Sequence, residues 1–201
     1  MTPPAVDFWF EFASTYSYPA AMRIEALADA QGVRLRWRPF LLGPIFKAQG
    51  WDNSPFNIYP LKGRYMWRDV ARVCRDLGLP FVQPAQFPQN GLLAARVALV
   101  GLDQGWGADF IRAVYRAQFA ESRIISDPAV LQAILVSLRR DARTVFEQAQ
   151  SAAIKTRLRE NTEEAQQIGI FGAPSTVTAD GELFWGNDRI EAALAWAKAG
   201  Q

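Results

Sequence analysis

Near the start of the chain, apolar and polar residues alternate as they do in a half-buried strand. Residues 6–12, VDFWFEF, carry four apolar side chains on one face, Val6, Phe8, Phe10 and Phe12, and Asp7, Trp9 and Glu11 between them. From Pro19 the spacing changes, and apolar residues recur as on one face of a helix. Residues 14–17, Ser-Thr-Tyr-Ser, are therefore predicted to form a strand-to-helix junction.

A second strand is predicted over residues 33–40, VRLRWRPF, where the alternation returns. Val33, Leu35 and Trp37 share one face, and the three arginines of the stretch share the other. Gly32 marks the end of the helix between the two strands. This order predicts a βαβ unit with parallel strands and a right-handed crossover.

The middle of the chain is predicted to be mostly helical. Residues 41–61 are rich in Gly, Pro and Asn, so we expect an irregular loop there, and loops of this length are commonly functional or mobile. Asp127 before Pro128 predicts an N-cap followed by proline at the first helical position. Helical patterns cover residues 62–77, 91–104, 108–120, 127–138 and 142–168.

The end of the chain returns to strands. Residues 175–178 and 182–185 are predicted strands, and the Asp180-Gly181 pair between them favours a hairpin turn. A last helix is expected over residues 187–198. The order βαβ, helices, ββα predicts an α/β protein of one domain, in which residues 5–60 and 169–201 share a mixed sheet and residues 61–168 form an all-helical insertion.

Composition narrows the possible chemistry. The 201 residues include no histidine, which excludes Ser-His-Asp and Cys-His catalysis and any metal site with a histidine ligand. The single cysteine, Cys74, excludes an internal disulfide and a redox Cys-x-x-Cys pair, and its place in a helical stretch favours a core position. The groups that could still carry catalysis are hydroxyls, carboxylates, Lys, Arg and backbone dipoles, or an external reagent.

Charge and hydropathy indicate an ordinary globular protein. Half of the residues are apolar, 21% are charged, and the formal net charge is +2. The arginines are scattered, so we expect no nucleic-acid partner. No apolar run reaches the roughly 18 to 20 residues of a membrane span, and the N-terminus lacks a secretory pattern. The cytoplasm is therefore the expected location.

Ser14 admits two interpretations. A serine before a helix is commonly an N-cap that accepts a hydrogen bond from a backbone N–H group. The start of a helix also carries free N–H groups and a partial positive charge, which together stabilise an anion held there. The residues around Ser14 do not choose between these interpretations by themselves.

Two motifs at opposite ends of the chain resemble one known family. FWFEFASTYSY and GIFGAPSTV, the latter followed by GELFWGNDR, are similar to signatures of 2-hydroxychromene-2-carboxylate isomerases. That family is similar to kappa-class glutathione transferases and has the DsbA-like thioredoxin fold, in which βαβ and ββα units flank a helical insertion. The oxidoreductases of this fold carry Cys-x-x-Cys where this chain has Ser14 and Ser17. The resemblance covers nearly the whole chain.

The resemblance implies a glutathione-dependent isomerase that interconverts 2-hydroxychromene-2-carboxylate, or a related intermediate of aromatic catabolism, and trans-o-hydroxybenzylidenepyruvate. Ser14 would donate a hydrogen bond to the sulfur of glutathione and help to keep it ionised. One alternative is a kappa-class-like glutathione transferase, which releases a conjugate. A further alternative is a non-catalytic thioredoxin-fold protein that binds a peptide or a protein partner.

The resemblance also implies which residues bind glutathione. Beside Ser14, it points to Ala173 and to Pro174, with a cis peptide bond between them that exposes the backbone of Ala173. By itself the sequence favours a trans proline at the start of a strand, because only about 5–6% of X-Pro bonds in folded proteins are cis. The last group is Trp185, Gly186, Asn187 and Asp188, in which Asn and Asp equally suit a simple helix cap.

The substrate, an aromatic carboxylate, would contact a second group of residues. Lys47 and Lys62 offer counter-charges for carboxylates, although each also suits a solvated surface position. Asn57 and Phe87 match family positions that line the aromatic substrate. Thr15 and Pro19 stand where the family usually has proline and leucine, which puts the substrate specificity in question. The resemblance further implies a homodimer.

Overall fold

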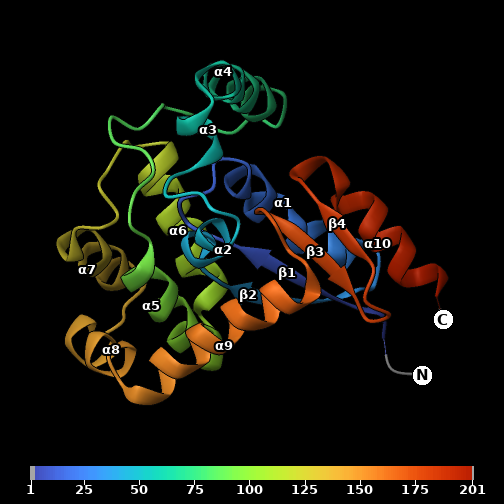
Figure 1. Cartoon of the computed structure of the whole chain (residues 1–201). Helices are drawn as coiled ribbons and strands as arrows, with labels where there is room; N and C mark the ends of the chain where they lie inside the picture. Colours follow the sequence, from blue (N-terminus) through green and yellow to red (C-terminus); the bar gives the residue numbers. More distant parts are fainter. Residues whose placement is uncertain (1–2, 201) are drawn as a thin grey trace.

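Four short strands form one mixed sheet in the computed structural model, which describes residues 3–200 (Figure 1). The strands are β1 (Ala5–Phe10), β2 (Arg34–Pro39), β3 (Ser175–Thr178) and β4 (Leu183–Trp185). Their spatial order is β2-β1-β3-β4. β1 and β2 are parallel, and β3 is antiparallel to both β1 and β4. The two ends of the chain therefore share one sheet, as predicted.

β1 is buried on both faces because each side of its pleat carries large apolar side chains. Phe8 and Phe10 belong to the larger hydrophobic cluster, together with Ile24. Trp9 belongs to a second cluster with Phe40 and is fully buried. Alternation alone placed Trp9 on the polar side. That side is also covered in the folded protein, so the indole lies in a core.

Helices cover both faces of this sheet (Figure 1). α1 (Ser17–Ala30) and α10 (Ile190–Ala199) contribute to the cluster on the Phe8 side. α2 (Leu42–Ala48) and α9 (Ala152–Ile168) contribute to the cluster around Trp9. The predicted last helix begins as a short 3₁₀ turn, η1 (Asn187–Arg189), before α10.

Between β2 and β3 the chain is helical, as predicted. α5 (Leu92–Asp103) supplies a run of buried residues from Val97 to Val100, and α6 (Gly107–Phe119) supplies Phe110, Tyr115 and Phe119 to the same cluster. The remaining helices of this region are α3 (Pro55–Ile58), α4 (Pro60–Asp76), α7 (Pro128–Ser137) and α8 (Ala142–Ala149).

The prediction of an irregular loop over residues 41–61 is wrong in part, because α2 and α3 lie within it. Leu42 and Ile45, three residues apart, are buried against the cluster around Trp9, and this tertiary contact stabilises a short helix. Ser54 caps α3 by accepting a hydrogen bond from the Phe56 N–H group at 3.3 Å. Gly43 and Pro44 lie in the first turn of α2 and Pro55 in the first turn of α3, where proline is tolerated.

The single helix predicted over residues 142–168 is two helices, α8 and α9. Ser151 lies between them with extended backbone angles, φ −60° and ψ 153°. Its side chain accepts a hydrogen bond from the Ile154 N–H group at 3.4 Å and so starts α9. The periodicity of the flanking residues is helical on both sides, so periodicity alone could not reveal this break.

Two local predictions are confirmed. The Asp127 carboxylate accepts a hydrogen bond from the Ala129 N–H group at 2.9 Å, which makes it the N-cap of α7. The Asp180-Gly181 pair joins β3 to β4, and Gly181 has a φ of +90° that favours glycine.

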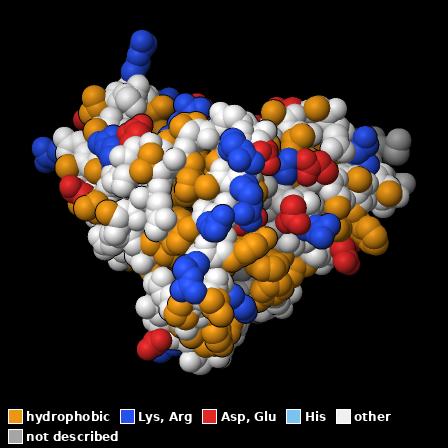
Figure 2. All heavy atoms as spheres, turned by 90° about the horizontal axis from the view of Figure 1, so that it is seen from above, with side chains coloured by type: hydrophobic (Ala, Val, Ile, Leu, Met, Phe, Trp, Pro, Cys, Tyr) orange, Lys and Arg blue, Asp and Glu red, His pale blue; other side chains and the backbone are white. Residues whose placement is uncertain are grey.

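α4 lies across the top of the molecule, and its outer side is basic (Figures 1 and 2). Arg64, Arg68 and Arg75 are exposed on this helix. Seen from above, Lys and Arg side chains gather in the middle of this face beside apolar ones (Figure 2). Within residues 3–200, every helix is too short or too polar to traverse a bilayer.

Candidate active site around Ser14

Ser14 lies in the turn between β1 and α1 and contacts both the helix and the other end of the chain. Its N–H group donates to the Glu11 carbonyl oxygen at 2.9 Å. Its Oγ accepts a hydrogen bond from the Ser17 N–H group at 3.2 Å and donates one to the Ala173 carbonyl oxygen at 2.8 Å. The side chain thus accepts a hydrogen bond from an N–H group in the first turn of α1. It also donates one to the residue before Pro174, in the C-terminal motif. The contact with the Ser17 N–H group is the one expected of a capping serine.

The Ala173–Pro174 peptide bond is cis, as the resemblance implied. Ala173 is 9% exposed, and Ser175, the first residue of β3, follows directly. Ser175 pairs with Trp9 in β1 and with Trp185 in β4. This register brings the end of β1, the start of β3 and the end of β4 to the same edge of the sheet. Ser14, the cis bend and the Trp185 segment therefore converge.

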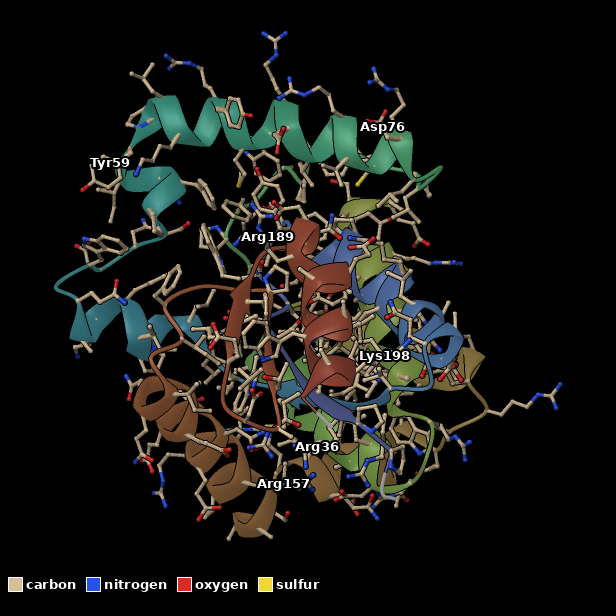
Figure 3. The ribbon with its side chains drawn as sticks, turned by 90° about the vertical axis from the view of Figure 1, so that its right-hand side faces the viewer. Arg36, Tyr59, Asp76, Arg157, Arg189 and Lys198 are labelled. Carbon is tan, nitrogen blue, oxygen red and sulfur yellow. The ribbon has the colours of Figure 1, made fainter. Side chains whose placement is uncertain are left out.

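The Trp185–Asp188 segment continues from β4 and is tied to the cis bend. The Gly186 N–H group donates to the Pro174 carbonyl oxygen at 2.9 Å. Gly186 has a φ of +116°, and a Cβ atom there would lie 2.5 Å from Asp188 Oδ1, so only glycine fits this turn. Asp188 is exposed and lies 3.7 Å from the Arg189 guanidinium. Arg189 directly precedes the first residue of α10, and this N-terminal end of the helix lies on the α4 side of the molecule (Figure 3).

Trp185 forms an aromatic surface beside the bend. Its ring packs against Phe171, with centroids 5.0 Å apart, and the two side chains are 49% and 47% exposed. A Cβ atom on Gly172 would lie 2.6 Å from Trp185 Nε1, so the glycine lets the indole approach the bend. Both aromatic side chains are available to a ligand at this edge.

Asn187 is held by an arginine of α1. Arg23 Nε donates to Asn187 Oδ1 at 2.9 Å, and its Nη2 donates to the Asn187 carbonyl oxygen. The same guanidinium pairs with Glu191 in the first turn of α10. The Asn187 side chain therefore contacts the protein itself, whereas the Asp188 side chain is exposed.

Glu11 is a buried carboxylic acid next to the Ser14 turn. Its oxygens accept hydrogen bonds from the N–H groups of Ala13 and Leu42, each at 3.2 Å. Only 8% of the residue is exposed, and this burial raises its pKa above the ordinary value. The predicted strand continued to residue 12, but β1 ends at Phe10 because Glu11 begins the turn. The side chain connects the Ser14 turn to the start of α2.

The two lysines expected at the substrate side are both exposed. Lys47 lies in the last turn of α2, and Lys62 lies in the first turn of α4. The Lys62 ammonium group lies 4.9 Å from the centre of the Tyr59 ring. Within the described part of the chain, neither lysine forms an ion pair, so their charges remain available to an anion.

Asn57 and Phe87, thirty residues apart in sequence, are brought together. Asn57 Nδ2 donates to the Phe87 carbonyl oxygen at 3.4 Å, and the Phe87 ring packs edge-on against Trp67 at 4.9 Å. Tyr16 links this region to the Ser14 turn, because its hydroxyl donates to Asp69 of α4 at 3.0 Å. Three other aromatic residues lie on the same stretch of chain: Tyr59 and Tyr65 are exposed, and Trp51 packs on Phe46.

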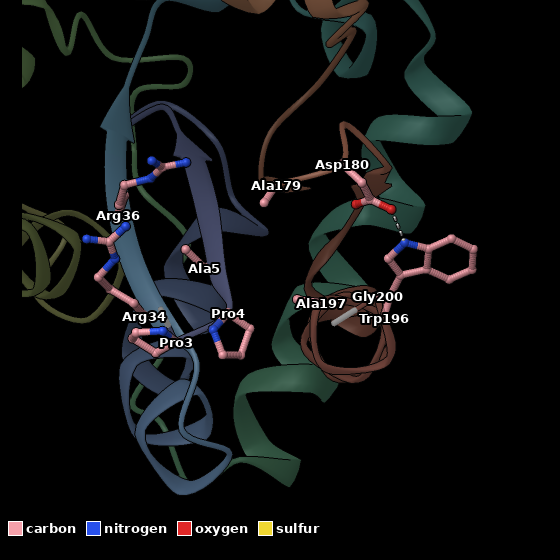
Figure 4. A pocket seen from close by; sticks show the side chains of 10 residues that line it. All are labelled: Pro3, Pro4, Ala5, Arg34, Arg36, Ala179, Asp180, Trp196, Ala197 and Gly200. Atoms are coloured by element: carbon pink, nitrogen blue, oxygen red, sulfur yellow. Dashed lines mark hydrogen bonds between the residues drawn. The ribbon is translucent and has the colours of Figure 1, made fainter. Parts of the chain in front are cut away.

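Two surface hollows lie away from this edge. One, of about 300 Å³, lies between the start of β1 and the end of α10 and is lined by residues that include Arg34, Asp180 and Trp196 (Figure 4). The other, of about 200 Å³, lies between α6 and α7. Neither is lined by Ser14 or the cis bend. The candidate site at this edge is described by its polar groups and their hydrogen bonds, and not by either hollow.

Comparison with known proteins identifies the family. Residues 5–195 match the DSBA-like thioredoxin domain. The chain belongs to the DSBA-like thioredoxin domain family. It is 29% identical to the 2-hydroxychromene-2-carboxylate isomerase of Sphingobium xenophagum, over 92% of this chain and 94% of that protein. It is 26% identical to human glutathione S-transferase kappa 1, over 94% and 88% of the two chains.

Solved structures support the same assignment. A 2-hydroxychromene-2-carboxylate isomerase structure superposes with a TM-score of 0.83 at 26% identity and covers 97% of this chain and 95% of its own. The DSBA-like thioredoxin domain here therefore has the predicted α/β fold with a helical insertion. The relatives are isomerases and glutathione transferases, which supports an enzymatic activity for this chain.

This DSBA-like thioredoxin domain carries no thiol at its candidate site. Its single cysteine, Cys74, is fully buried in α4, as expected, and burial raises the pKa of its thiol to about 11. The start of α1 instead offers hydroxyls, and Thr15 Oγ1 is buried without a hydrogen-bond partner among residues 3–200.

Sequence reasoning missed three side chains that shape this site: Glu11, Tyr16 as a polar link, and Arg23. Glu11 and Arg23 read as polar positions of amphipathic elements, which are usually solvated. Each instead contacts a segment distant in sequence, α2 for Glu11 and η1 for Arg23. No local pattern in the sequence distinguishes such contacts from solvent exposure.

Proposed function

We propose that this protein is a glutathione-dependent isomerase of 2-hydroxychromene-2-carboxylate, or of a related intermediate of aromatic catabolism, to trans-o-hydroxybenzylidenepyruvate. The observation that carries the proposal is the Ser14 hydroxyl, held at the start of α1 and hydrogen-bonded to the residue before cis-Pro174. Relatives named as isomerases, at 29% identity over most of the chain, support the reaction class.

The residues at the site fit glutathione. Ser14 offers a hydroxyl donor, and the buried Thr15 Oγ1 beside it lacks a protein partner within residues 3–200. The start of α1 favours an anion because its N–H groups and dipole point outward. A thiol with an ordinary pKa of roughly 8.5 would be more ionised in such a place. Bound glutathione would supply the thiolate that adds to the conjugated system of the substrate and is regenerated after bond rotation.

The Ser14 hydroxyl has one hydrogen to donate, and in this structure it goes to the Ala173 carbonyl oxygen. Binding would turn this donor toward the sulfur of glutathione. The Ala173 carbonyl oxygen would then be free to accept a hydrogen bond from the cysteinyl N–H group of the ligand. One rotation of the hydroxyl thus opens both contacts, and Ser14 acts by stabilising a negative charge and not as a nucleophile.

The γ-glutamyl end of glutathione would lie against the turn after β4. Backbone N–H groups of Asn187 and Asp188 lie at the start of the last helical segment, where a carboxylate is favoured. The exposed Asp188 carboxylate is free to pair with the ammonium group of the ligand. Trp185, half exposed beside the cis bend, would pack on the peptide part.

The substrate would lie between the Ser14 turn and the α3–α4 segment. Lys47 and Lys62 would attract its carboxylate because both are exposed and free of ion pairs within the described residues. Asn57 and Phe87, in contact with each other, would present an amide and a ring edge to its aromatic part.

The test is to incubate the purified protein with 2-hydroxychromene-2-carboxylate in the presence and absence of glutathione. We expect conversion only with glutathione, and an undiminished amount of free thiol after many turnovers. Conversion without glutathione, or binding of glutathione without any conversion of this substrate or its aromatic analogues, would contradict the proposal.

The second candidate is a glutathione transferase, favoured by the 26% identity with the human kappa-class enzyme over 94% of this chain. It uses the same thiolate site but predicts stoichiometric loss of free thiol and a stable conjugate. A non-catalytic binding protein is the third candidate. It predicts no binding of glutathione at millimolar concentration by calorimetry.

A further inference from the structure

Within residues 3–200, Arg23 is the residue of α1 whose side chain forms hydrogen bonds to the turn after β4. Its guanidinium donates to the side chain and to the carbonyl oxygen of Asn187, and it forms a two-point ion pair with Glu191. The Arg23 side chain is only 19% exposed. Because Arg23 forms all of these bonds simultaneously, it holds the start of α10 against α1.

The turn that Arg23 holds has few other attachments. Gly186 is bonded to the Pro174 carbonyl oxygen, and the Arg189 N–H group donates back to Gly186 at 3.2 Å. In the part of the chain that the structure describes, the Asp188 carboxylate forms one ion pair, at 3.7 Å with its exposed neighbour Arg189. Among the described residues, the bonds from Arg23 to Asn187 are the side-chain hydrogen bonds that join this turn to α1.

We propose that Arg23 is a positioning residue for the γ-glutamyl end of glutathione, which holds the Gly186–Arg189 turn in the shape that binds this group. The inference rests on the proposed function. A turn that is ordered before binding loses less conformational entropy when the ligand arrives. Replacing Arg23 should therefore lower the affinity for glutathione, although Arg23 itself does not contact the ligand. Arginine suits this role because its planar fork can hold a carboxylate and a carbonyl oxygen together, which a lysine cannot do.

The experiment compares Arg23→Gln and Arg23→Lys with the unchanged protein by calorimetric titration. Two ligands are used: glutathione, and cysteinylglycine, which lacks the γ-glutamyl group. For Arg23→Gln we expect glutathione affinity to fall by about tenfold, as for the loss of hydrogen bonds to a charged group. We expect the affinity for cysteinylglycine to stay unchanged, and Arg23→Lys to recover little of the loss.

A matched control is Arg112→Gln. Arg112 of α6 also bridges to α1, through Glu25, and its side chain is 25% exposed, but it does not contact the turn after β4. We expect this variant to bind both ligands as the unchanged protein does. Circular dichroism and thermal unfolding of each variant establish that it is folded before titration.

A second measurement uses Asp188→Asn alone and combined with Arg23→Gln. If Arg23 acts through the turn, the two losses of glutathione affinity are not additive, because the disordered turn no longer presents Asp188. Additive losses, equal losses for both ligands, or no loss in Arg23→Gln would overturn the inference and leave the proposed function standing. Failure of the unchanged protein to bind glutathione would instead overturn the proposed function, and the inference with it.

Discussion

The Ser14 hydroxyl donates a hydrogen bond to the Ala173 carbonyl oxygen across 2.8 Å, joining residues 159 positions apart in the chain. One side of this bond is the first turn of α1, and the other is the bend with the cis Ala173–Pro174 bond. The bond therefore sits where the two ends of the chain meet and where we expect the sulfur of glutathione.

Replacing Ser14 by alanine should abolish most of the activity and leave the fold intact. The change removes one donor and one acceptor, so we expect a loss of about 1 kcal/mol in the free energy of unfolding. Turnover should fall by about 100-fold or more, because a donor to the developing charge is lost. Steady-state kinetics and urea unfolding measure the two effects.

Ser175→Ala is the matched control for that prediction. Ser175 is also buried near the bend, and its hydroxyl donates to the Gly172 carbonyl oxygen at 2.9 Å. It should lose similar stability but keep its turnover. Wild-type turnover in Ser14→Ala would show that the Ser14 hydroxyl is only a structural cap.

Asp188→Asn should weaken glutathione binding without changing stability. Its side chain is 74% exposed and pairs only with Arg189, so the folded state loses little. We expect a several-fold rise in the dissociation constant, since the ammonium group of the ligand loses its counter-charge. Calorimetric titration measures this rise, and an unchanged constant would remove Asp188 from the site.

Cys74 should take no part in the reaction. Because burial raises the pKa of its thiol to about 11, the thiol is protonated at neutral pH and inaccessible. Iodoacetamide should label it only after unfolding. Cys74→Ala should keep full turnover with glutathione, at a cost of about 1 kcal/mol in stability. Loss of turnover in a folded Cys74→Ala protein would contradict a mechanism that uses an external thiol.

Glu11 should make the protein less stable as the pH rises. Its pKa is raised in the folded state by burial, so the folded protein binds more protons than the unfolded chain above the ordinary pKa of glutamate. The contribution of Glu11 to the free energy of unfolding is therefore highest below that ordinary pKa. It falls as the pH rises through the pKa that Glu11 has in the folded protein. The slope is at most about 1.4 kcal/mol per pH unit for one group.

Urea unfolding across this pH range tests the Glu11 prediction. Glu11→Gln should flatten the decline, whereas Glu160→Gln, on the exposed side of α9, should keep it. An equal decline in both variants would assign the pH dependence to other groups.

Much of the fold could be predicted from local patterns in the sequence. Alternation located β1 and β2, and the Asp180-Gly181 pair located the hairpin, because the alternating pattern of a strand and the residue types of a tight turn are both visible within a few residues. The cap at Asp127 was found in the same way. The motif around Ser14 and the one around Pro174 could each be recognised, but only the family resemblance linked them.

Tertiary structure decided the rest. Leu42 and Ile45 form a helix because they pack under Trp9, and residues 142–168 divide at Ser151, although neither feature is visible in the local spacing. The same holds for Glu11 and Arg23, polar residues that look solvated in the sequence and are bonded to distant segments in the fold. The sequence by itself determined the strands, the turn and the absence of histidine and paired cysteines. Only folding determined which side chains converge on Ser14, because such contacts depend on segments more than a hundred residues apart meeting at one edge of the sheet.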